Sequence, residues 1–213
     1  LIYYRNQEKQ EYTGGRTKDA IVSWVLKKSG PPSTAVDCAT LKTKVADAKF
    51  AIAYFGDENE ALYKDAHVPA ADVEEKIQFF HVSDAACAAD YGTSAPGLVF
   101  FRTFEEPVNV YAGIADKDSL TAWYKPLMVP TLFKFTEDEI EAVFGQQQNT
   151  LILFRDKADD EAAYVKIYEQ ASQAHKGKIL FSFSDKSNDI QGKLADFMGV
   201  SDSDLPTLRA IIP

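Results

Sequence analysis

Residues 50–55 have the sequence FAIAYF, six apolar residues without interruption. A run that lacks polar alternation is typical of a strand buried on both faces, as in a sheet covered by helices on both sides. Working outward, the pattern predicts strands at 34–36, 77–82, 97–101 and 108–111, and helices at 37–47, 58–68, 84–90 and 116–124. Strands that alternate with helices and end in a hairpin indicate an α/β sandwich with a mixed sheet.

The same order of elements begins again after Val129 and Pro130. Here the pattern predicts strands at 131–135, 150–154, 178–183 and 207–211, and helices at 137–144, 161–175 and 189–198. The hairpin strand and closing helix of the first unit have no counterpart before residue 213. We therefore expect one whole domain at 33–128 and an incomplete domain at 129–213.

Residues 12–25 and 111–124 are two copies of one pattern, 99 residues apart. The identical positions are Tyr12, Gly14, Lys18, Asp19 and Trp24 in the first copy, and Tyr111, Gly113, Lys117, Asp118 and Trp123 in the second. A period of about 100 residues is the size of a small domain and too long for a solenoid repeat. Because the first copy lies so near residue 1, we expect the chain to start in mid-domain. The helix of the second copy is expected to stop near Pro126.

Composition and charge are those of a water-soluble globular protein, with 46% hydrophobic residues and a net charge of −9. An acidic protein repels phosphate backbones, so binding to nucleic acid or to an anionic membrane is not expected. No apolar run is long enough to span a bilayer. Cys38 and Cys87 belong to no CxxC or metal-spaced cluster. We expect them to be unpaired small apolar residues, with a disulfide between them as the alternative.

Two segments that contain proline resemble the cis-proline segment and the following strand of thioredoxin domains. They are APGLVFF at 95–101 and LPTLRAI at 205–211, and LIYYRN at 1–6 resembles the same strand without its proline. The resemblance implies an α/β fold class of tandem thioredoxin-like folds, one complete and two partial, each a mixed sheet flanked by helices. It also implies cis bonds at Pro96 and Pro206, which would leave the backbone of the preceding residue free to pair with an extended peptide.

Other segments resemble the protein disulfide isomerase family in particular. Residues 12–25 resemble the end of its first catalytic domain, whereas 91–104 and 175–181 resemble its non-catalytic domains b and b′. On this resemblance residues 1–30 are the C-terminal tail of the catalytic domain a. Residues 33–128 are domain b, and 129–213 are an incomplete domain b′.

The catalytic sulfur atoms of that family are missing from both units. In active thioredoxin domains a CxxC motif lies where the second strand meets the second helix, because the helix N-terminus favours the thiolate. The corresponding segments here are FGDEN at 55–59 and FRDKAD at 154–159, in which the acidic residues suit a helix N-terminus. We predict that neither unit performs dithiol exchange, so there are no catalytic residues.

No metal or cofactor site is predicted from the remaining polar residues. His67, His81 and His175 are scattered, without metal-ligand spacing. The acidic groups at 137–139, 159–161 and 202–204 are expected to be solvated helix caps rather than calcium ligands.

The remaining activity expected of such a chain is recognition of polypeptides. The second unit is rich in aromatic residues, and the b′ resemblance implies that some of them line an apolar pocket for unfolded chains, which expose apolar side chains. The residues we predict for this pocket, at the place where the first and third strands meet the third helix, are Phe133, Phe144, Phe154, Ile179, Phe181, Met198 and Leu205.

The resemblance therefore implies a non-catalytic substrate-binding and spacer fragment of a protein disulfide isomerase. The parent would catalyse thiol–disulfide exchange and act as a folding chaperone in the lumen of the endoplasmic reticulum. Expected partners are unfolded or misfolded polypeptides and flanking catalytic thioredoxin domains. The alternative is an acidic luminal calcium-binding or scaffold protein resembling calsequestrin, which the 23 basic residues disfavour. A relative that docks an acidic lectin arm would need a basic b′ surface, and the acid-rich second unit gives no support for one.

Overall fold

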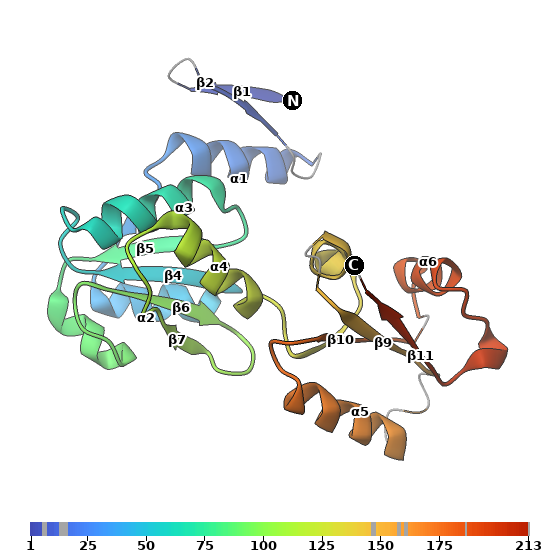
Figure 1. Ribbon diagram of the computed structural model, residues 1–213. Helices are drawn as coiled ribbons and strands as arrows, with labels where there is room; N and C mark the ends of the chain where they lie inside the picture. The colour runs from blue at the N-terminus through green and yellow to red at the C-terminus, as the bar shows by residue number, and fades with distance from the viewer. Residues whose placement is uncertain are drawn as a thin grey trace. The chain divides into compact units, whose positions relative to one another are not determined.

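The computed structural model describes residues 1–5, 8–12, 17–145, 148–156, 159, 162–185 and 187–212. The chain divides into two compact units, unit 1 (Leu1–Met128) and unit 2 (Val129–Pro213), which Figure 1 shows with their helices and strands. In the part of the chain that the structure describes, no helix has the length and apolar character needed to cross a membrane.

Unit 1 is built around a five-stranded mixed sheet in the order β3-β5-β4-β6-β7. Its strands are β3 (Thr34–Ala35), β4 (Phe50–Phe55), β5 (Gln78–Val82), β6 (Gly97–Arg102) and β7 (Val108–Val110). Strand β4 pairs in parallel with β5 and antiparallel with β6, and all six of its residues are buried. The FAIAYF stretch is thus a central strand, as predicted.

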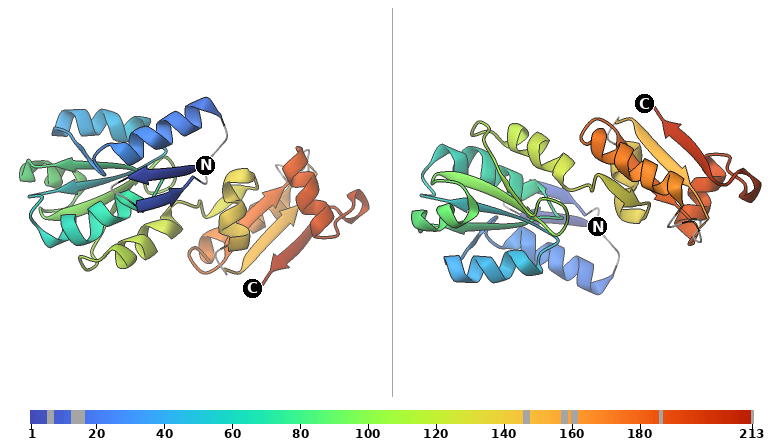
Figure 2. Two further views of the ribbon diagram at one scale, coloured as in Figure 1. Left: turned by 90° about the horizontal axis from the view of Figure 1, so that it is seen from above. Right: turned by 90° about the horizontal axis from the view of Figure 1, so that it is seen from below.

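Helices cover both faces of this sheet, as the two views in Figure 2 show. They are α2 (Cys38–Asp47), η1 (Leu62–His67), α3 (Val68–Val73), η2 (Ala85–Tyr91) and α4 (Lys117–Leu127). Alternate residues of β4 supply two separate cores. Ile52 packs with η1, α3 and α4, whereas Ala53 packs with α2 and η2. This alternation is the period-two geometry of a strand with helices on both sides.

Two helices of unit 1 have bounds that differ from those predicted. The helix expected at 58–68 begins at Leu62 as a π-helix and continues as α3 to Val73. The closing helix α4 does not stop before Pro126 but includes it and ends at Leu127. A proline removes one N–H donor, and so close to the helix end this affects a single turn.

The repeated pattern forms the same local structure twice within unit 1. Strands β1 (Ile2–Arg5) and β2 (Glu8–Glu11) pair antiparallel and precede α1 (Lys18–Ser29), as β6 and β7 precede α4. The rings of Tyr12 and Trp24 are 5.2 Å apart between centroids, and those of Tyr111 and Trp123 are 5.0 Å apart. The shared identities therefore preserve one tyrosine–tryptophan contact. Gly14 and Gly15 lie outside the described residues.

The two cysteines are joined, so the expectation that they are unpaired is wrong. Cys38 at the start of α2 forms a disulfide with Cys87 in η2, across 49 residues of sequence. Cys87 is buried in the core between the sheet and these two helices. The bridge thus links the two helices on one face of the unit 1 sheet.

Unit 2 contains a four-stranded sheet in the order β11-β9-β10-β8. Its strands are β8 (Leu132–Lys134), β9 (Thr150–Phe154), β10 (Leu180–Ser184) and β11 (Thr207–Ile211). Its helical segments are η3 (Glu137–Glu139), η4 (Glu141–Gly145), α5 (Ala163–Ala174), α6 (Asp189–Phe197) and η6 (Asp202–Asp204). The order of strands is that of unit 1 without its fifth strand. The helix predicted at 137–144 is present as a 3-10 turn, η3, followed by a π-helical segment, η4.

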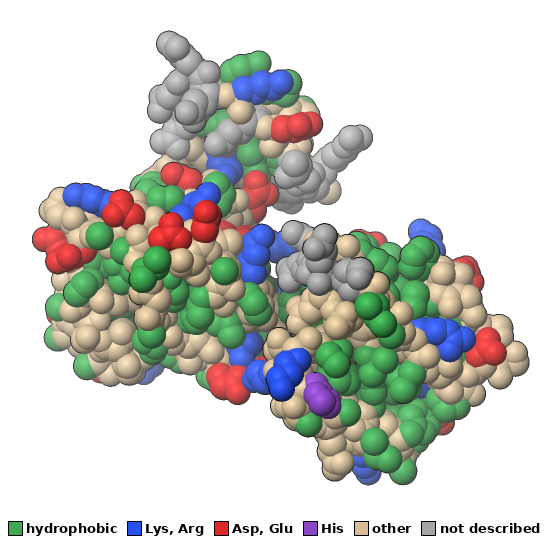
Figure 3. Space-filling model, viewed as in Figure 1, with side chains coloured by type: hydrophobic (Ala, Val, Ile, Leu, Met, Phe, Trp, Pro, Cys, Tyr) green, Lys and Arg blue, Asp and Glu red, His purple; other side chains and the backbone are tan. Residues whose placement is uncertain are grey.

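The two faces of the unit 2 sheet differ in their cover. Figure 1 shows α6 on one side of the sheet and α5 on the other. The α6 face carries a core that includes Phe133, Ile152 and Phe154, and the α5 face carries Leu153 and Phe181. Among the described residues α5 is the only helix of unit 2 on its face, and Figure 3 shows hydrophobic side chains gathered on the visible surface of this unit.

Candidate functional site

The junction after β4 in unit 1 corresponds to the place where thioredoxin enzymes carry their cysteines. Gly56 has a φ of 139°, and a Cβ there would lie 2.8 Å from the Tyr54 hydroxyl and 3.3 Å from Cα of Pro96. Only glycine fits this position. The Tyr54 hydroxyl donates to the carbonyl of Asp57 at 2.8 Å, and burial together with nearby carboxylates raises the pKa of Tyr54 to about 12.

A polar cavity of about 480 Å³ opens at this junction. It is lined by Gly56, Asp57, Glu58, Asn59 and Ser83. Asp57 accepts a hydrogen bond from the backbone N–H of Asn59 at 2.8 Å, so it stabilises a turn in the loop, whereas the helix that follows has Ala61 at its N-cap and not the predicted acidic cap. Glu58 instead contacts Nε2 of His81 at 3.0 Å, which the sequence did not indicate. No sulfur lies among these residues, so the junction has no nucleophile for dithiol exchange.

The equivalent junction of unit 2 also lacks sulfur. Phe154 is buried in the core, and the buried guanidinium of Arg155 lies 4.8 Å from the ring centre of Phe183. Lys157 and Ala158 lie outside the described residues. A buried cation stacked on an aromatic ring thus occupies this position.

Both predicted cis bonds, Ala95–Pro96 and Leu205–Pro206, are present. Ala95 packs against the core beneath α2, and Leu205 packs against the core beneath α6. The pairing of their backbone with an extended peptide stays a prediction.

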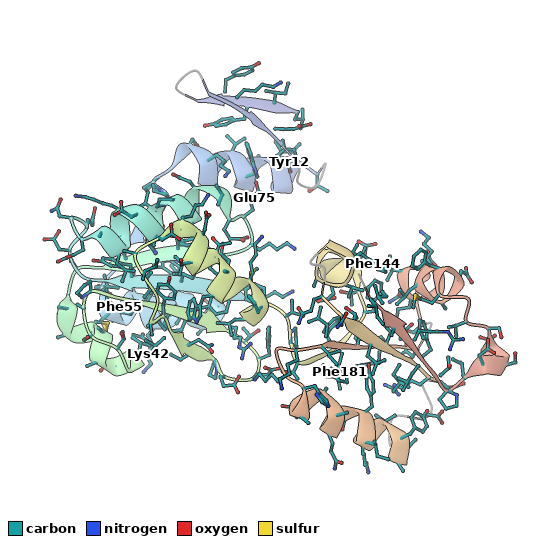
Figure 4. The ribbon with its side chains drawn as sticks, in the orientation of Figure 1. Tyr12, Lys42, Phe55, Glu75, Phe144 and Phe181 are labelled. Carbon is teal, nitrogen blue, oxygen red and sulfur yellow. A yellow bond between two sulfur atoms is a disulfide. The ribbon has the colours of Figure 1, made fainter. Side chains whose placement is uncertain are left out.

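The residues predicted for a pocket in unit 2 do not form one cluster. Phe133, Phe154, Met198 and Leu205 belong to the core on the α6 face, whereas Ile179 and Phe181 belong to the core on the α5 face. Figure 4 shows Phe144 and Phe181 far apart in unit 2. The expectation of a single cluster is wrong because the side chain of Phe181 in β10 points away from α6, and on the side that faces α6 this strand carries Ser182 and Ser184.

An apolar cavity of about 180 Å³ does open on the α6 face, around Phe144. It is lined by Phe135, Ile140, Phe144, Ile190, Lys193, Leu194 and Phe197. The ring of Phe144 is 5.8 Å from that of Phe197 and 6.2 Å from that of Phe135, both nearly perpendicular. Phe144 is 45% exposed and Phe197 is 73% exposed. Large aromatic side chains are rarely so exposed in proteins, and here two of them are in contact with each other.

Of the residues that line this cavity, our selection from sequence included only Phe144. Helical spacing could have found others, because Ile190, Leu194 and Phe197 follow one another at four and three residues along α6. Ile140 and Phe144 have the same four-residue spacing. We favoured strand residues instead, and these fill the core.

An ion pair between Lys134 and Asp185 fixes the loop that follows β10, at the end of the unit 2 sheet where β8 also ends. Lys134 Nζ donates to Oδ2 of Asp185 at 2.7 Å and to the Ser187 hydroxyl at 3.0 Å. Burial alone raises the pKa of Asp185, but the hydrogen bonds from Lys134 and Ser187 outweigh it and lower the pKa to about 2.

We expect this pair to make unit 2 less stable in acid. The carboxyl group of an aspartate in an unfolded chain has a pKa of about 3.9. Asp185 therefore stabilises the fold fully above that pH and loses its contribution as the pH falls through about 2. In Asp185→Asn the free energy of unfolding, measured with urea by circular dichroism, should depend less on pH between about 5 and 2. Asp189→Asn, at an exposed position on α6, should keep the native dependence. Equal slopes in the native chain and Asp185→Asn would contradict this assignment.

Of the three acidic groups expected to be helix caps, the one at 202–204 forms a cap, whereas Glu139 accepts from the Thr136 hydroxyl and Asp159 from the Tyr164 hydroxyl. Ser201 and Asp204 form a capping box, with the N–H of Ser201 donating to Asp204 Oδ2 at 2.8 Å. Asp160 and Glu161 lie outside the described residues, as does the side chain of Asp138. In the described part of the chain, one group has the spacing of metal ligands, Cys38, Cys87 and Asp90, and its sulfurs are bound to each other.

The fold and the sequence together identify the class of this protein. Residues 55–212, more than half of the chain, match the family described as a thioredoxin-like domain. The chain therefore belongs to the thioredoxin-like domain family, and the predicted fold class is confirmed. Two solved structures share the fold. The bb fragment of ERp72 has a TM-score of 0.56 at 13% identity, covering 85% of this chain and 84% of that one. The zinc-bound form of human ERp44 has a TM-score of 0.55 at 19% identity, covering 98% and 60%.

The curated relatives are protein disulfide isomerases, so the predicted family resemblance is confirmed. The chain is 32% identical to the protein disulfide-isomerase of Gallus gallus over 99% of its own length and 42% of that protein. It is 30% identical to the one from Oryctolagus cuniculus, over 95% of this chain and 40% of the relative. This chain thus spans about two fifths of the length of these relatives.

Proposed function

We propose that this chain is the non-catalytic, substrate-binding and spacer part of a protein disulfide isomerase. Residues 1–30 would be the end of catalytic domain a, 33–128 domain b, and 129–213 part of domain b′. The similarity to protein disulfide isomerases over nearly the whole chain supports this division. So does the chemistry, since the only two cysteines form a disulfide with each other and neither junction carries a CxxC. The parent would catalyse thiol–disulfide exchange and chaperone folding in the endoplasmic reticulum.

The observation that carries the binding role is the pair of exposed rings, Phe144 and Phe197, over an apolar cavity. An unfolded polypeptide differs from a folded one in exposing apolar side chains, so its receptor needs an accessible apolar surface with few fixed polar partners. Among the residues that the structure describes, Lys193 is the one charged side chain that lines the cavity. The expected ligands are therefore unfolded or misfolded polypeptides, held by apolar side chains.

The exposed α5 face offers a matched control for this proposal. Leu208 in β11 is 49% exposed, and it lies three residues before Ile211, which packs against the α6 core. Residues an odd number apart in a strand point to opposite faces, so Leu208 points to the α5 face. If a hydrophobic ligand bound any exposed apolar surface equally well, substitution of Leu208 would weaken its binding as much as substitution of Phe197.

We expect Phe197→Ser to weaken binding of an unstructured, fluorescently labelled hydrophobic peptide roughly tenfold, because an aromatic anchor of this kind contributes about 1–2 kcal/mol. Phe144→Ala should act similarly, and Leu208→Ser should change the affinity less than twofold. Fluorescence anisotropy gives the dissociation constants. The proposed function fails if the native chain binds no such peptide. The cavity is the wrong site if Leu208→Ser weakens binding and Phe197→Ser does not.

A further inference from the structure

The apolar cavity around Phe144 adjoins a second cavity of about 540 Å³. The residues that line the second cavity are Thr136, Glu137, Asn188, Asp189 and Ile190. Ile190 lines both cavities, and Thr136 follows directly after Phe135, which lines the apolar one. The two cavities therefore form one groove along the start of α6, with an apolar part and a polar part.

The polar part of the groove is negatively charged. Glu137 and Asp189 line it and are both exposed. Neither carboxylate has a hydrogen-bond donor or an ion-pair partner among the residues that the structure describes. Asp189 does not cap α6, because the side chain of Asn188 accepts the backbone N–H at the start of that helix. Two carboxylates thus face solvent beside the apolar cavity, with their charges available to a ligand.

The described cations around the groove leave this negative charge in place. Lys134, at the end of β8, is already paired with Asp185 at 2.7 Å. Lys193 lines the apolar cavity, one turn along α6 from Asp189, and forms no ion pair with a described carboxylate. The start of a helix carries a partial charge of only about half a positive unit, which is less than the charge of two carboxylates. A ligand in the groove therefore meets negative charge at its polar end.

We propose that this groove selects polypeptide segments in which a large apolar side chain is flanked by a basic residue. The apolar side chain enters the cavity beside Phe144 and Phe197, and the lysine or arginine head group lies against Glu137 and Asp189. A long basic side chain suits this arrangement, because its methylene stem packs on apolar surface while its charge stays in water. Ile190, which lines both parts, supplies that surface. The preference rests on the proposed function, since it concerns the same cavity.

Charge gives the groove a selectivity that its apolar part alone lacks. An apolar cavity accepts any large hydrophobic side chain, whatever its neighbours in the polypeptide are. The carboxylates attract a basic neighbour and repel an acidic one, so they discriminate through both attraction and repulsion. Segments with acidic residues next to their apolar side chains are therefore the ones that the groove disfavours.

Three fluorescently labelled, unstructured peptides test this preference, each with a leucine–phenylalanine–leucine segment in a glycine–serine background. They differ only in the residues on both sides of that segment, which are lysine, glutamine or glutamate. We expect the native chain to bind the lysine peptide about tenfold more tightly than the glutamate peptide, with the glutamine peptide between them, in fluorescence anisotropy at low salt. In about 0.5 M NaCl the ratio should fall below about twofold, because salt screens exposed charges.

Substitutions assign the preference to the two carboxylates. Glu137→Gln and Asp189→Asn should each lower the ratio between the lysine and glutamate peptides about threefold, and the double variant should nearly abolish it. Glu169→Gln is the matched control, since Glu169 is exposed on α5, on the opposite face of the sheet, and should keep the native ratio. Phe197→Ser should weaken binding of all three peptides by a similar factor, because it removes apolar contact and leaves the charges.

Equal affinity of the native chain for the three peptides, or tighter binding of the glutamate peptide, would overturn the preference and leave the proposed function standing. Binding of none of them would remove both. These results are read from the native chain and need no variant to fold. The preference also fails if the double variant keeps the native ratio. It fails as well if Glu169→Gln lowers the ratio as much as Asp189→Asn, which would assign it to the overall charge of the protein.

Discussion

Replacing both Cys38 and Cys87 by alanine is expected to lower the free energy of unfolding of unit 1 by about 4 kcal/mol. The disulfide closes a loop of 49 residues, and without it the unfolded chain gains the conformational entropy that this loop excludes. The loop contains β4 and β5, the two strands at the centre of the sheet. Loss of the bridge therefore affects the whole unit.

Tryptophan fluorescence during urea unfolding measures this effect selectively, because the only two tryptophans, Trp24 and Trp123, both lie in unit 1. A dithiol reductant should destabilise the native chain to a similar extent and leave the alanine variant unchanged. The difference between the reduced native chain and the variant gives the packing contribution of Cys87, which is buried beside Leu41 and Phe55. A loss below about 1 kcal/mol in both experiments would show that the bridge does not constrain the unfolded chain.

Arg102→Leu is expected to cost about 3 kcal/mol, because it removes a buried guanidinium and leaves two backbone carbonyl acceptors without their hydrogen bonds. The side chain of Arg102 is 2% exposed. Its Nε donates to the Glu106 carbonyl at 2.9 Å, its Nη1 to the Leu127 carbonyl at 3.0 Å, and its Nη2 to Oε2 of Glu106 at 2.5 Å. The guanidinium thus joins the β6–β7 hairpin to the end of α4. The Glu106 carboxylate is largely exposed and can be hydrated in the variant, so the cost comes mainly from the two carbonyl groups.

Arg102→Lys is the matched variant for this prediction. Lysine keeps the positive charge but lacks the planar fork that reaches two carbonyls and a carboxylate at once. We expect it to recover less than half of the lost stability in urea unfolding monitored by Trp123, which lies on α4. Full recovery by lysine would show that charge alone, and not the arrangement of donors, holds the hairpin to the helix.

Local patterns predicted most of the fold. The uninterrupted apolar run at 50–55 became a strand buried on both faces, and β9 and β11 have the predicted bounds. The repeated pattern at 12–25 and 111–124 became the same hairpin-and-helix unit with the same tyrosine–tryptophan contact. These features depend on neighbours in sequence and on periodicity, so the residues themselves carry the information.

The candidate site was predicted only in part. Phe144 was selected from the sequence and does line the apolar cavity, but Phe133, Phe154 and Phe181 fill cores. Aromatic content identifies which residues are apolar without telling which of them remain exposed. The spacing along α6 pointed to Phe197 more directly than any strand pattern did.

The amino-acid sequence alone was sufficient to establish the strand and helix order, the thioredoxin-like class and the lack of a CxxC in either unit. The tertiary structure decided which distant side chains meet: Cys38 with Cys87, Phe144 with Phe197, and Ser33 with both His67 and His81. The physical reason is that such contacts depend on the order of strands in a sheet and on the face to which each residue points. A shift of one residue along a strand reverses that face, and a periodic sequence pattern does not record what lies opposite.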